Sequence, residues 1–285
     1  MLSLDSFWED TRKYWADLRS IGPVVIVTDG LRDGTAYYLT RREDMLEVLL
    51  DPNRYVRTAP SPTRRAVDLT RPLLRRREVN ADMSSPLRER AAAAIDSVAV
   101  AVASGKAVMT SEIGSLFADH VFFAMTGISY REELPQAVSE HRTAFLSKLV
   151  DQAGNPIDDA EAVDLVEMLV LAGHEALAAA ANNAVREFLV KPELYDELRE
   201  GPQRVADFVD ELVGTVSTTI TRETTAAVTV AGVEIPAGSR VELCVGAPAD
   251  GPGGRLDFGT GLHQCIGRHL SVLALTAFVQ EWLTL

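Results

Sequence analysis

Apolar side chains recur at helical spacing along most of this chain and alternate, as in β-strands, in only two short regions. One region lies near residues 24–39 and the other between residues 218 and 245. We therefore predict a mainly α fold with a small β region. Strands are expected at 24–27, at 36–39 and within 218–245. Helices are expected at 5–20, 42–50, 73–81, 85–104, 109–126, 134–150, 159–189, 205–216 and 268–283, with one more starting at residue 191.

Proline and glycine residues set several of these boundaries. Gly22-Pro23 ends the first helix, and Ser85-Pro86 has the residue types of an N-cap and a first helical turn. We therefore expect one helix to stop before residue 85 and a new one to begin there. Residues 57–72 are rich in Pro and Arg without periodicity, which predicts a loop.

Composition narrows the class of protein. The 285 residues, 47% of them hydrophobic, are expected to form a single domain over residues 1–285. The formal charge of −13 argues against nucleic acid as a partner. The N-terminus has no basic flank or long apolar span, so no membrane segment is expected. Cys244 and Cys265 are the only cysteines, which favours the reducing cytoplasm over a disulfide framework.

One of the two cysteines lies in a loop punctuated by glycines, just before the last predicted helix. Amide N–H groups of such a loop, and the helix N-terminus that follows, favour a thiolate over a thiol. A thiolate held in this way can ligate a soft or borderline metal such as haem iron. The alternative is a turn around a structural cysteine, the role we expect for Cys244 in its strand. The loop residues are Phe258, Gly259, Gly261, His263, Cys265 and Gly267.

These six positions match Phe-Gly-x-Gly-x-His-x-Cys-x-Gly, and the loop closely resembles the haem-binding loop of the cytochrome P450 superfamily. The resemblance implies haem b as the cofactor and Cys265 as the axial iron ligand. It also implies that Phe258 shields the sulfur, that Gly259, Gly261 and Gly267 shape the loop, and that His263 binds a haem propionate.

Two further segments resemble the propionate-binding regions of that family. Arg222, in a segment similar to the family's "tRrat" strand, falls on a propionate-binding position. The helix that crosses the haem edge usually carries His-x-x-x-Arg; here no His is present, and Arg76 within Arg75-Arg76-Arg77 is the candidate. The same run also suits a solvated basic face or a docking patch for an acidic electron-transfer protein.

Residues 169–176, Leu-Val-Leu-Ala-Gly-His-Glu-Ala, resemble the central distal helix of the family. Gly173 would allow close approach to the helix backbone, and Glu175 stands at the acid position of the proton relay, although a solvent-exposed carboxylate is the simpler alternative. Ala176 replaces the usual Thr, so the hydroxyl that bonds iron-bound dioxygen is missing. His174 is expected to point elsewhere.

Other positions depart from the family. Glu211 lies where Glu-x-x-Arg is expected, but Gly214 replaces the Arg, so Glu211 should be exposed or reached by Arg222 or Arg255. Only about forty residues separate Gly127 from the distal-helix segment. The expectation is a shortened, divergent, bacterial-type member: a reduced fold that lacks part of the roof helices, the meander and the C-terminal strands.

Three functions remain open at this point. The first is a haem-thiolate oxidoreductase of secondary metabolism that oxidises or rearranges a small or carrier-bound substrate. Without the Thr, peroxide-driven or non-oxidative chemistry gains over the monooxygenase route. The second is an auxiliary protein that activates a partner enzyme such as a glycosyltransferase. The third is a haem-binding sensor or a non-functional remnant. A ferredoxin-type electron donor and a homodimer are further hypotheses.

Overall fold

The computed structural model describes residues 11–29, 34–58, 64–129, 133–140, 144–151, 154–201, 203–216, 219–246 and 256–285. Its contacts divide the chain into two compact units. Unit 1 comprises Met1–Ser61 and Gly214–Cys265, and unit 2 comprises Pro62–Val213 and Ile266–Leu285. The single domain expected over residues 1–285 stays a prediction.

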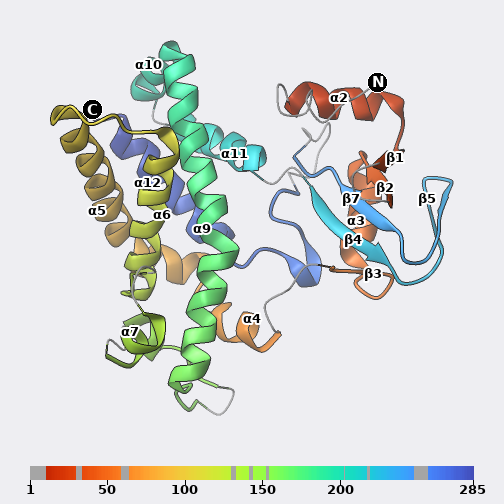
Figure 1. Ribbon diagram of the computed structural model, residues 1–285, viewed down its shortest axis with the longest axis horizontal. Coiled ribbons are helices and arrows are strands. Elements are labelled where there is room, and N and C mark those ends of the chain that lie inside the picture. The colour runs from red at the N-terminus through yellow and green to blue at the C-terminus, as the bar shows by residue number, and fades with distance from the viewer. Residues whose placement is uncertain are drawn as a thin grey trace. The chain divides into compact units, whose positions relative to one another are not determined.

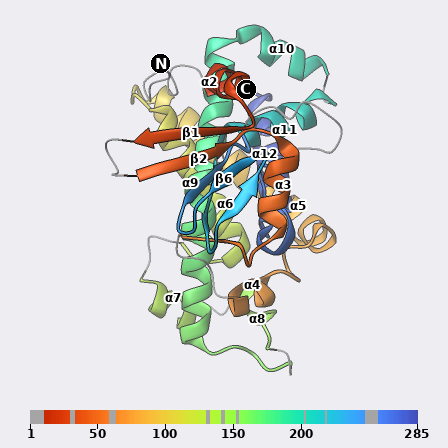
Figure 2. The same cartoon turned by 90° about the vertical axis from the view of Figure 1, so that its right-hand side faces the viewer.

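Unit 1 is built on a five-stranded sheet of order β1–β2–β7–β4–β3. β2 and β7 run parallel, and the other neighbours are antiparallel. Figure 2 shows β1 and β2 side by side as the first pair of this sheet. The elements of the unit are α2 (Thr11–Ile21), β1 (Val24–Asp29), β2 (Gly34–Leu39), α3 (Arg42–Leu50), β3 (Tyr55–Val56), β4 (Ile220–Thr224), β5 (Val228–Val230), β6 (Val233–Ile235), β7 (Arg240–Leu243) and η1 (Gly261–His263).

The core of unit 1 lies between α3 and the sheet. Met45, Val48 and Leu49 of α3 pack with Val241 and Leu243 of β7, all of them buried. β5 and β6 form a separate hairpin whose turn residues, Ala231 and Gly232, both have positive φ. Such a turn matches the twist of the strands that it joins.

Unit 2 is helical. Its longest helix packs against α6, and α5 packs against both α6 and α12, as Figure 1 shows. The helices are α4 (Arg64–Thr70), α5 (Arg76–Ala103), α6 (Thr110–Thr126), α7 (Leu134–Glu140), α8 (Ala144–Ser147), α9 (Asp159–Val190), α10 (Pro192–Glu200), α11 (Arg204–Val216), whose last turn belongs to unit 1, and α12 (Arg268–Trp282). Within the described ranges, no helix has the length and apolar content needed to cross a membrane.

The contact between α6 and α9 depends on one glycine. The Gly114 N–H donates to Asn182 Oδ1 at 2.9 Å. A Cβ added to Gly114 would lie 2.2 Å from the Ala178 carbonyl oxygen. The two helices therefore approach so closely that only a residue without a side chain fits at this position.

The expected mainly α fold with a small β region is confirmed. The helix predicted at 42–50 has the bounds of α3, and the helix predicted at 159–189 ends one residue later, at Val190. Cys244 is fully buried in unit 1, as expected of a small core residue.

The prediction of two separate helices on either side of residue 85 is wrong. A single helix, α5, runs from Arg76 to Ala103 with Pro86 inside it. Proline inside a helix removes one backbone hydrogen bond and clashes with the preceding turn. Val79 and Leu87, before and after it, are both buried. Packing of both halves against the core thus outweighs the local signal for a break.

The loop predicted at 57–72 is also wrong in part, because α4 occupies Arg64–Thr70. Two contacts stabilise this short helix. Thr70 is buried and donates its hydroxyl to the Ala66 carbonyl, and the Arg65 guanidinium bonds the Glu161 carboxylate of α9. The second contact spans 96 residues, so no local pattern could reveal it.

The single helix predicted at 134–150 is wrong at its C-terminal end. Within the described residues this region contains α7 and α8, and Val150 forms an isolated β-bridge with Pro156. The Asn155 N–H donates to Asp151 Oδ1, which closes a turn that competes with further helix.

Candidate functional site

The loop that carries Cys265 is closed by its own backbone. The Cys265 N–H donates to the Phe258 carbonyl at 2.8 Å, and the Gly259 N–H donates to the Leu256 carbonyl at 2.7 Å. Cys265 is exposed, and Phe258 is partly exposed. Gly267 is the N-cap of α12, so the predicted helix begins three residues after the cysteine. The cysteine is therefore exposed on a loop whose backbone is held by its own hydrogen bonds.

Two glycines give this loop its shape. Gly259 has φ 63° and Gly261 has φ 68°, the left-handed region that residues with a Cβ rarely adopt. At Gly259 an added Cβ would make only ordinary contacts, the nearest at 3.6 Å. Glycine is therefore favoured here by the left-handed backbone conformation and not by a lack of room for a side chain. At Gly261 a Cβ would lie 3.2 Å from Leu50 and 3.3 Å from the Leu49 carbonyl, which shows that the loop rests on the end of α3.

A cluster of basic groups lies in the same unit. Arg222 is only 5% exposed, and its Nη1 donates to the Thr221 carbonyl at 2.8 Å. Burial lowers the pKa of Arg222, and the charge of Arg57 lowers it further. The pKa of His263 is lowered by burial and then by the charges of Arg222 and Arg57. We call these three residues the Arg57–Arg222–His263 cluster.

Within the described parts of the chain, no carboxylate forms an ion pair with Arg57 or Arg222. A buried guanidinium beside a second positive charge is costly unless an anion is close to both. The cluster therefore has the charge and the open donors of a site that could bind an anion. His263 and Arg222 were predicted here from the sequence, whereas Arg57 was missed, because only the pairing of β3 with β4 brings it near.

The distal-helix residues lie in unit 2, on α9. Glu175 and Ala176 are exposed, and Gly173 is partly exposed. A Cβ at Gly173 would lie 2.9 Å from Cζ of Phe122 on α6, so this glycine has a packing role. Leu171, one turn earlier than Glu175, is 82% exposed. An apolar side chain and a carboxylate thus share one open face of the helix.

The structure also places His174 and Glu211. His174 Nε2 lies 2.7 Å from Asp119 Oδ1 on α6, so the side chain points into the helix packing, as expected. Glu211 is exposed. An exposed carboxylate has no burial penalty to offset, and Arg255, one of the two partners considered for Glu211, lies outside the described residues.

Arg76 is exposed at the start of α5, together with Arg75 and Arg77. The charges of Arg268 and Arg76 both lower the pKa of His269, after burial itself, so the start of α12 lies near the start of α5. Arg76, Arg268 and His269 are exposed and lie near one another, and Arg75 and Arg77 are exposed beside Arg76 in the sequence; we call these five residues the basic patch. The patch contrasts with the chain's net charge of −13.

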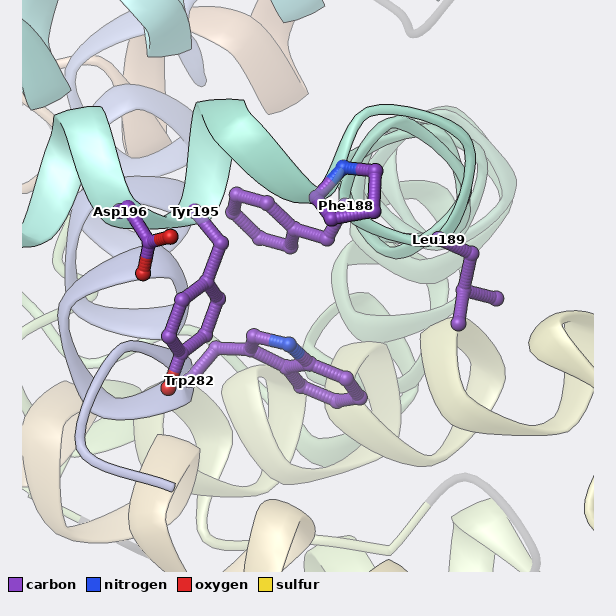
Figure 3. A pocket seen from close by; sticks show the side chains of 6 residues that line it. Phe188, Leu189, Tyr195, Asp196 and Trp282 are labelled. Atoms are coloured by element: carbon purple, nitrogen blue, oxygen red, sulfur yellow. The ribbon is translucent and has the colours of Figure 1, made fainter.

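A pocket of about 360 Å³ lies at the ends of α9 and α12 beside α10. Figure 3 shows the rings of Phe188, Tyr195 and Trp282 around it. The carboxylate of Asp196 lies on the far side of the Tyr195 ring from Phe188 and Trp282. None of the residues predicted as functional lines this pocket.

Comparison with known proteins identifies relatives of one kind, although no family model matches the chain. The chain is 31% identical over 157 residues to "Vitamin D(3) 25-hydroxylase" of Pseudonocardia autotrophica, covering 47% of this chain and 39% of that protein. It is 31% identical over 158 residues to "Erythromycin C-12 hydroxylase" of Saccharopolyspora erythraea, covering 48% and 40%. The aligned part thus spans less than half the length of these curated relatives.

Solved structures match over more of the chain. The structure of "P450BioI in complex with hexadec-9Z-enoic acid ligated Acyl Carrier Protein" superposes with a TM-score of 0.77 at 20% identity. The match covers 98% of this chain and 92% of that one. At this level of identity the likeness concerns the fold.

Proposed function

We propose that the chain is a haem-thiolate enzyme of the bacterial type of the cytochrome P450 superfamily, with Cys265 as the iron ligand. We further propose that it oxidises or rearranges a small or carrier-bound substrate in secondary metabolism. The observation that carries the proposal is an exposed cysteine in the same unit as a basic cluster that has no carboxylate partner among the described residues.

The residues of unit 1 fit haem b. Cys265 would supply the sulfur ligand, and His263 and Arg222 would bind the porphyrin carboxylates through charge-assisted hydrogen bonds. Gly259 and Gly261 fix the backbone that carries the sulfur, and Phe258 would limit water at it. Bound haem with a thiolate ligand supplies oxidation chemistry, because the thiolate donates electron density to the iron.

The residues of α9 would set which oxidant can be used. Glu175 is an exposed carboxylate that can hold a proton at its Oε atoms, whereas Ala176 has no hydroxyl to donate or accept one. The short side chain of Ala176 is exposed on α9 next to Glu175, and Leu171 is exposed one turn earlier. These features favour peroxide-driven or non-oxidative chemistry over the dioxygen route.

The charge of the exposed surface indicates which partner proteins could bind. The basic patch suits an acidic electron donor of the ferredoxin type or an acidic carrier protein. The complex of P450BioI with an acyl carrier protein supports the carrier-bound alternative. The cytoplasm remains the predicted compartment, and a homodimer remains a hypothesis that light scattering would test.

The first experiment is an absorption spectrum of the protein expressed with a supply of haem, before and after dithionite and carbon monoxide. We expect the red-shifted Soret band of a thiolate-ligated carbonyl complex. Cys265→Ser should abolish it, whereas the matched control Cys244→Ala should keep it, because Cys244 is buried in the core. A wild-type protein without bound haem would contradict the proposal.

A second experiment separates the oxidants. Turnover of a test substrate is measured with peroxide and with a ferredoxin-type donor, for the wild type and for Ala176→Thr. The variant should raise donor-driven turnover several-fold and leave peroxide-driven turnover unchanged, since the added hydroxyl serves only the dioxygen route. Equal donor-driven rates of the two proteins would show that the missing hydroxyl at Ala176 does not limit the dioxygen route.

The auxiliary-protein function is the second candidate, and it is favoured by the missing hydroxyl at Ala176 and by the 82% exposure of Leu171. It predicts a stable complex with a partner enzyme and partner activity that does not depend on Cys265. A Cys265→Ser protein that activates a partner as well as the wild type does would move the assignment to this candidate. A haem-binding sensor, in contrast, would show the spectrum but no turnover with either oxidant.

A further inference from the structure

We propose that Arg57 is a third cationic ligand of the porphyrin carboxylates, placed opposite Arg222 so that it weakens the protein without haem and strengthens haem binding. This inference rests on the proposed function. It adds a residue to which neither the sequence nor the comparisons assign a role.

The sheet register gives the position of Arg57. β3 pairs with β4 antiparallel, with Tyr55 opposite Thr224 and Val56 opposite Glu223. Continuing this register by one residue places Arg57 opposite Arg222. Residues directly opposite on an antiparallel pair lie close enough for their side chains to interact, and like charges there are destabilising.

The two arginines differ in their surroundings. Arg222 is buried in the middle of β4 and also pairs, through its backbone, with Val241 of β7. Among the described residues its guanidinium donates one hydrogen bond, to the Thr221 carbonyl, and its other N–H groups are left for solvent or a ligand. Arg57 is exposed, so it can reach a ligand that lies beside Arg222 without itself being desolvated.

Carboxylates of the surrounding elements are engaged elsewhere. Asp51, before β3, accepts from Arg54, and Glu242 of β7 accepts from Arg240 and Thr221. Glu223, next to Arg222 along β4, points to the opposite face of the strand, because successive side chains alternate. The chain itself thus supplies no anion to the pair among the residues described.

The cluster has the charge that a dicarboxylate requires. Haem b carries two propionates, and each carboxylate accepts several hydrogen bonds. Of His263 and Arg222, only Arg222 carries a permanent positive charge, because a guanidinium stays protonated in proteins whereas an imidazole can be neutral. Arg57 brings the number of permanent charges to two, whereas Arg76 lies near Arg268 and His269 of unit 2.

The test measures haem affinity and thermal stability for the wild type, Arg57→Gln, Arg57→Lys and the control Arg186→Gln, an exposed arginine of α9. Haem-free protein is titrated with haem and, in parallel, with haem dimethyl ester, in which both carboxylates are blocked. Arg57→Gln should weaken haem binding about tenfold and leave binding of the ester unchanged, since charge-assisted hydrogen bonds have about this worth.

The same variant should raise the melting temperature of the haem-free protein, because it removes the charge that opposes Arg222. Arg57→Lys should recover part of the haem affinity, and Arg186→Gln should behave as the wild type in every arm. A gain in stability without haem together with a loss of affinity is a combination that a purely structural role would not produce.

Three results would overturn the inference. They are unchanged haem affinity in Arg57→Gln, an equal loss for haem and its ester, and a lower melting temperature of the haem-free variant. A wild-type protein that binds no haem would overturn the proposed function together with this inference. Haem binding that is insensitive to residue 57 would overturn the inference alone.

Discussion

The Cys265 loop and the middle of α9 both carry a motif glycine, but these glycines do different work. In the loop, Gly259 has positive φ and room for a Cβ, so it is needed for the backbone conformation. In α9, Gly173 has ordinary helical geometry, and Phe122 occupies the space of a side chain.

The two motifs therefore differ in what explains them. The glycine of α9 is explained by packing between helices of unit 2, with no reference to a cofactor. The positive φ of the loop glycines, and the lack of a carboxylate beside Arg57 and Arg222 among the described residues, have no such explanation. Haem binding is therefore expected to depend on unit 1, whereas α9 affects mainly which reaction the bound haem supports.

The largest effect that we expect comes from Gly114→Ala in α6. Its Cβ would lie 2.2 Å from the Ala178 carbonyl, and backbone cannot move aside as a flexible side chain can. We expect the free energy of unfolding to fall by about 2–4 kcal/mol. Denaturant titration measures it, and Gly105→Ala, where φ is 81° and nothing lies within 4 Å, should cost only about 1 kcal/mol. Similar losses for both would contradict the packing argument.

The second prediction compares Gly259→Ala with Gly173→Ala. The first should cost about 1–2 kcal/mol through a left-handed backbone with a Cβ and should also reduce haem content. The second should cost about 1 kcal/mol at Phe122 and leave the haem spectrum unchanged, because the Phe122 ring tip can shift. If Gly173→Ala lost haem and Gly259→Ala kept the haem spectrum, the roles assigned to the two glycines would be contradicted.

A third prediction compares two buried polar side chains of unit 1, Tyr55 and Arg222, by their effects on stability and on haem affinity. The Tyr55 hydroxyl is fully buried and has no hydrogen-bond partner among the described residues. Tyr55→Phe removes that unsatisfied group and should raise the free energy of unfolding by about 1 kcal/mol with haem affinity unchanged. Arg222→Gln, in contrast, should reduce haem affinity, and a fall in stability on Tyr55→Phe would indicate a partner for the hydroxyl.

The smallest effect concerns the ion pair that holds α4 to α9. The Arg65 guanidinium lowers the pKa of Glu161 below its ordinary value of 4.5. A carboxyl with a lowered pKa in the folded state stabilises the protein above about pH 4.5, and this stabilisation is lost as the pH falls through the folded-state pKa. Glu161→Gln should therefore flatten the fall in melting temperature between about pH 5 and pH 3. An unchanged pH profile would show that the pair is too exposed to matter.

Much of the helical frame could be predicted from the sequence, because hydrophobic periodicity is a local property. The bounds of α3 and the extent of α9 follow from it directly. The errors fall where distant contacts outweigh the local signal. Pro86 lies inside α5 because residues on both sides of it are buried, and α4 forms where Arg65 meets Glu161.

The candidate site divides in the same way. The spacing of glycines, histidine and cysteine around Cys265 is a local pattern, so the sequence alone determined the loop, its thiolate candidate and the helix that follows. Only the tertiary structure decided that Glu211 is exposed, that Gly173 packs against Phe122 and that β3 pairs with β4 in the register from which we infer the place of Arg57. Burial and cross-strand pairing depend on residues far apart in the chain, and their positions become defined only when the sheet and the helices pack.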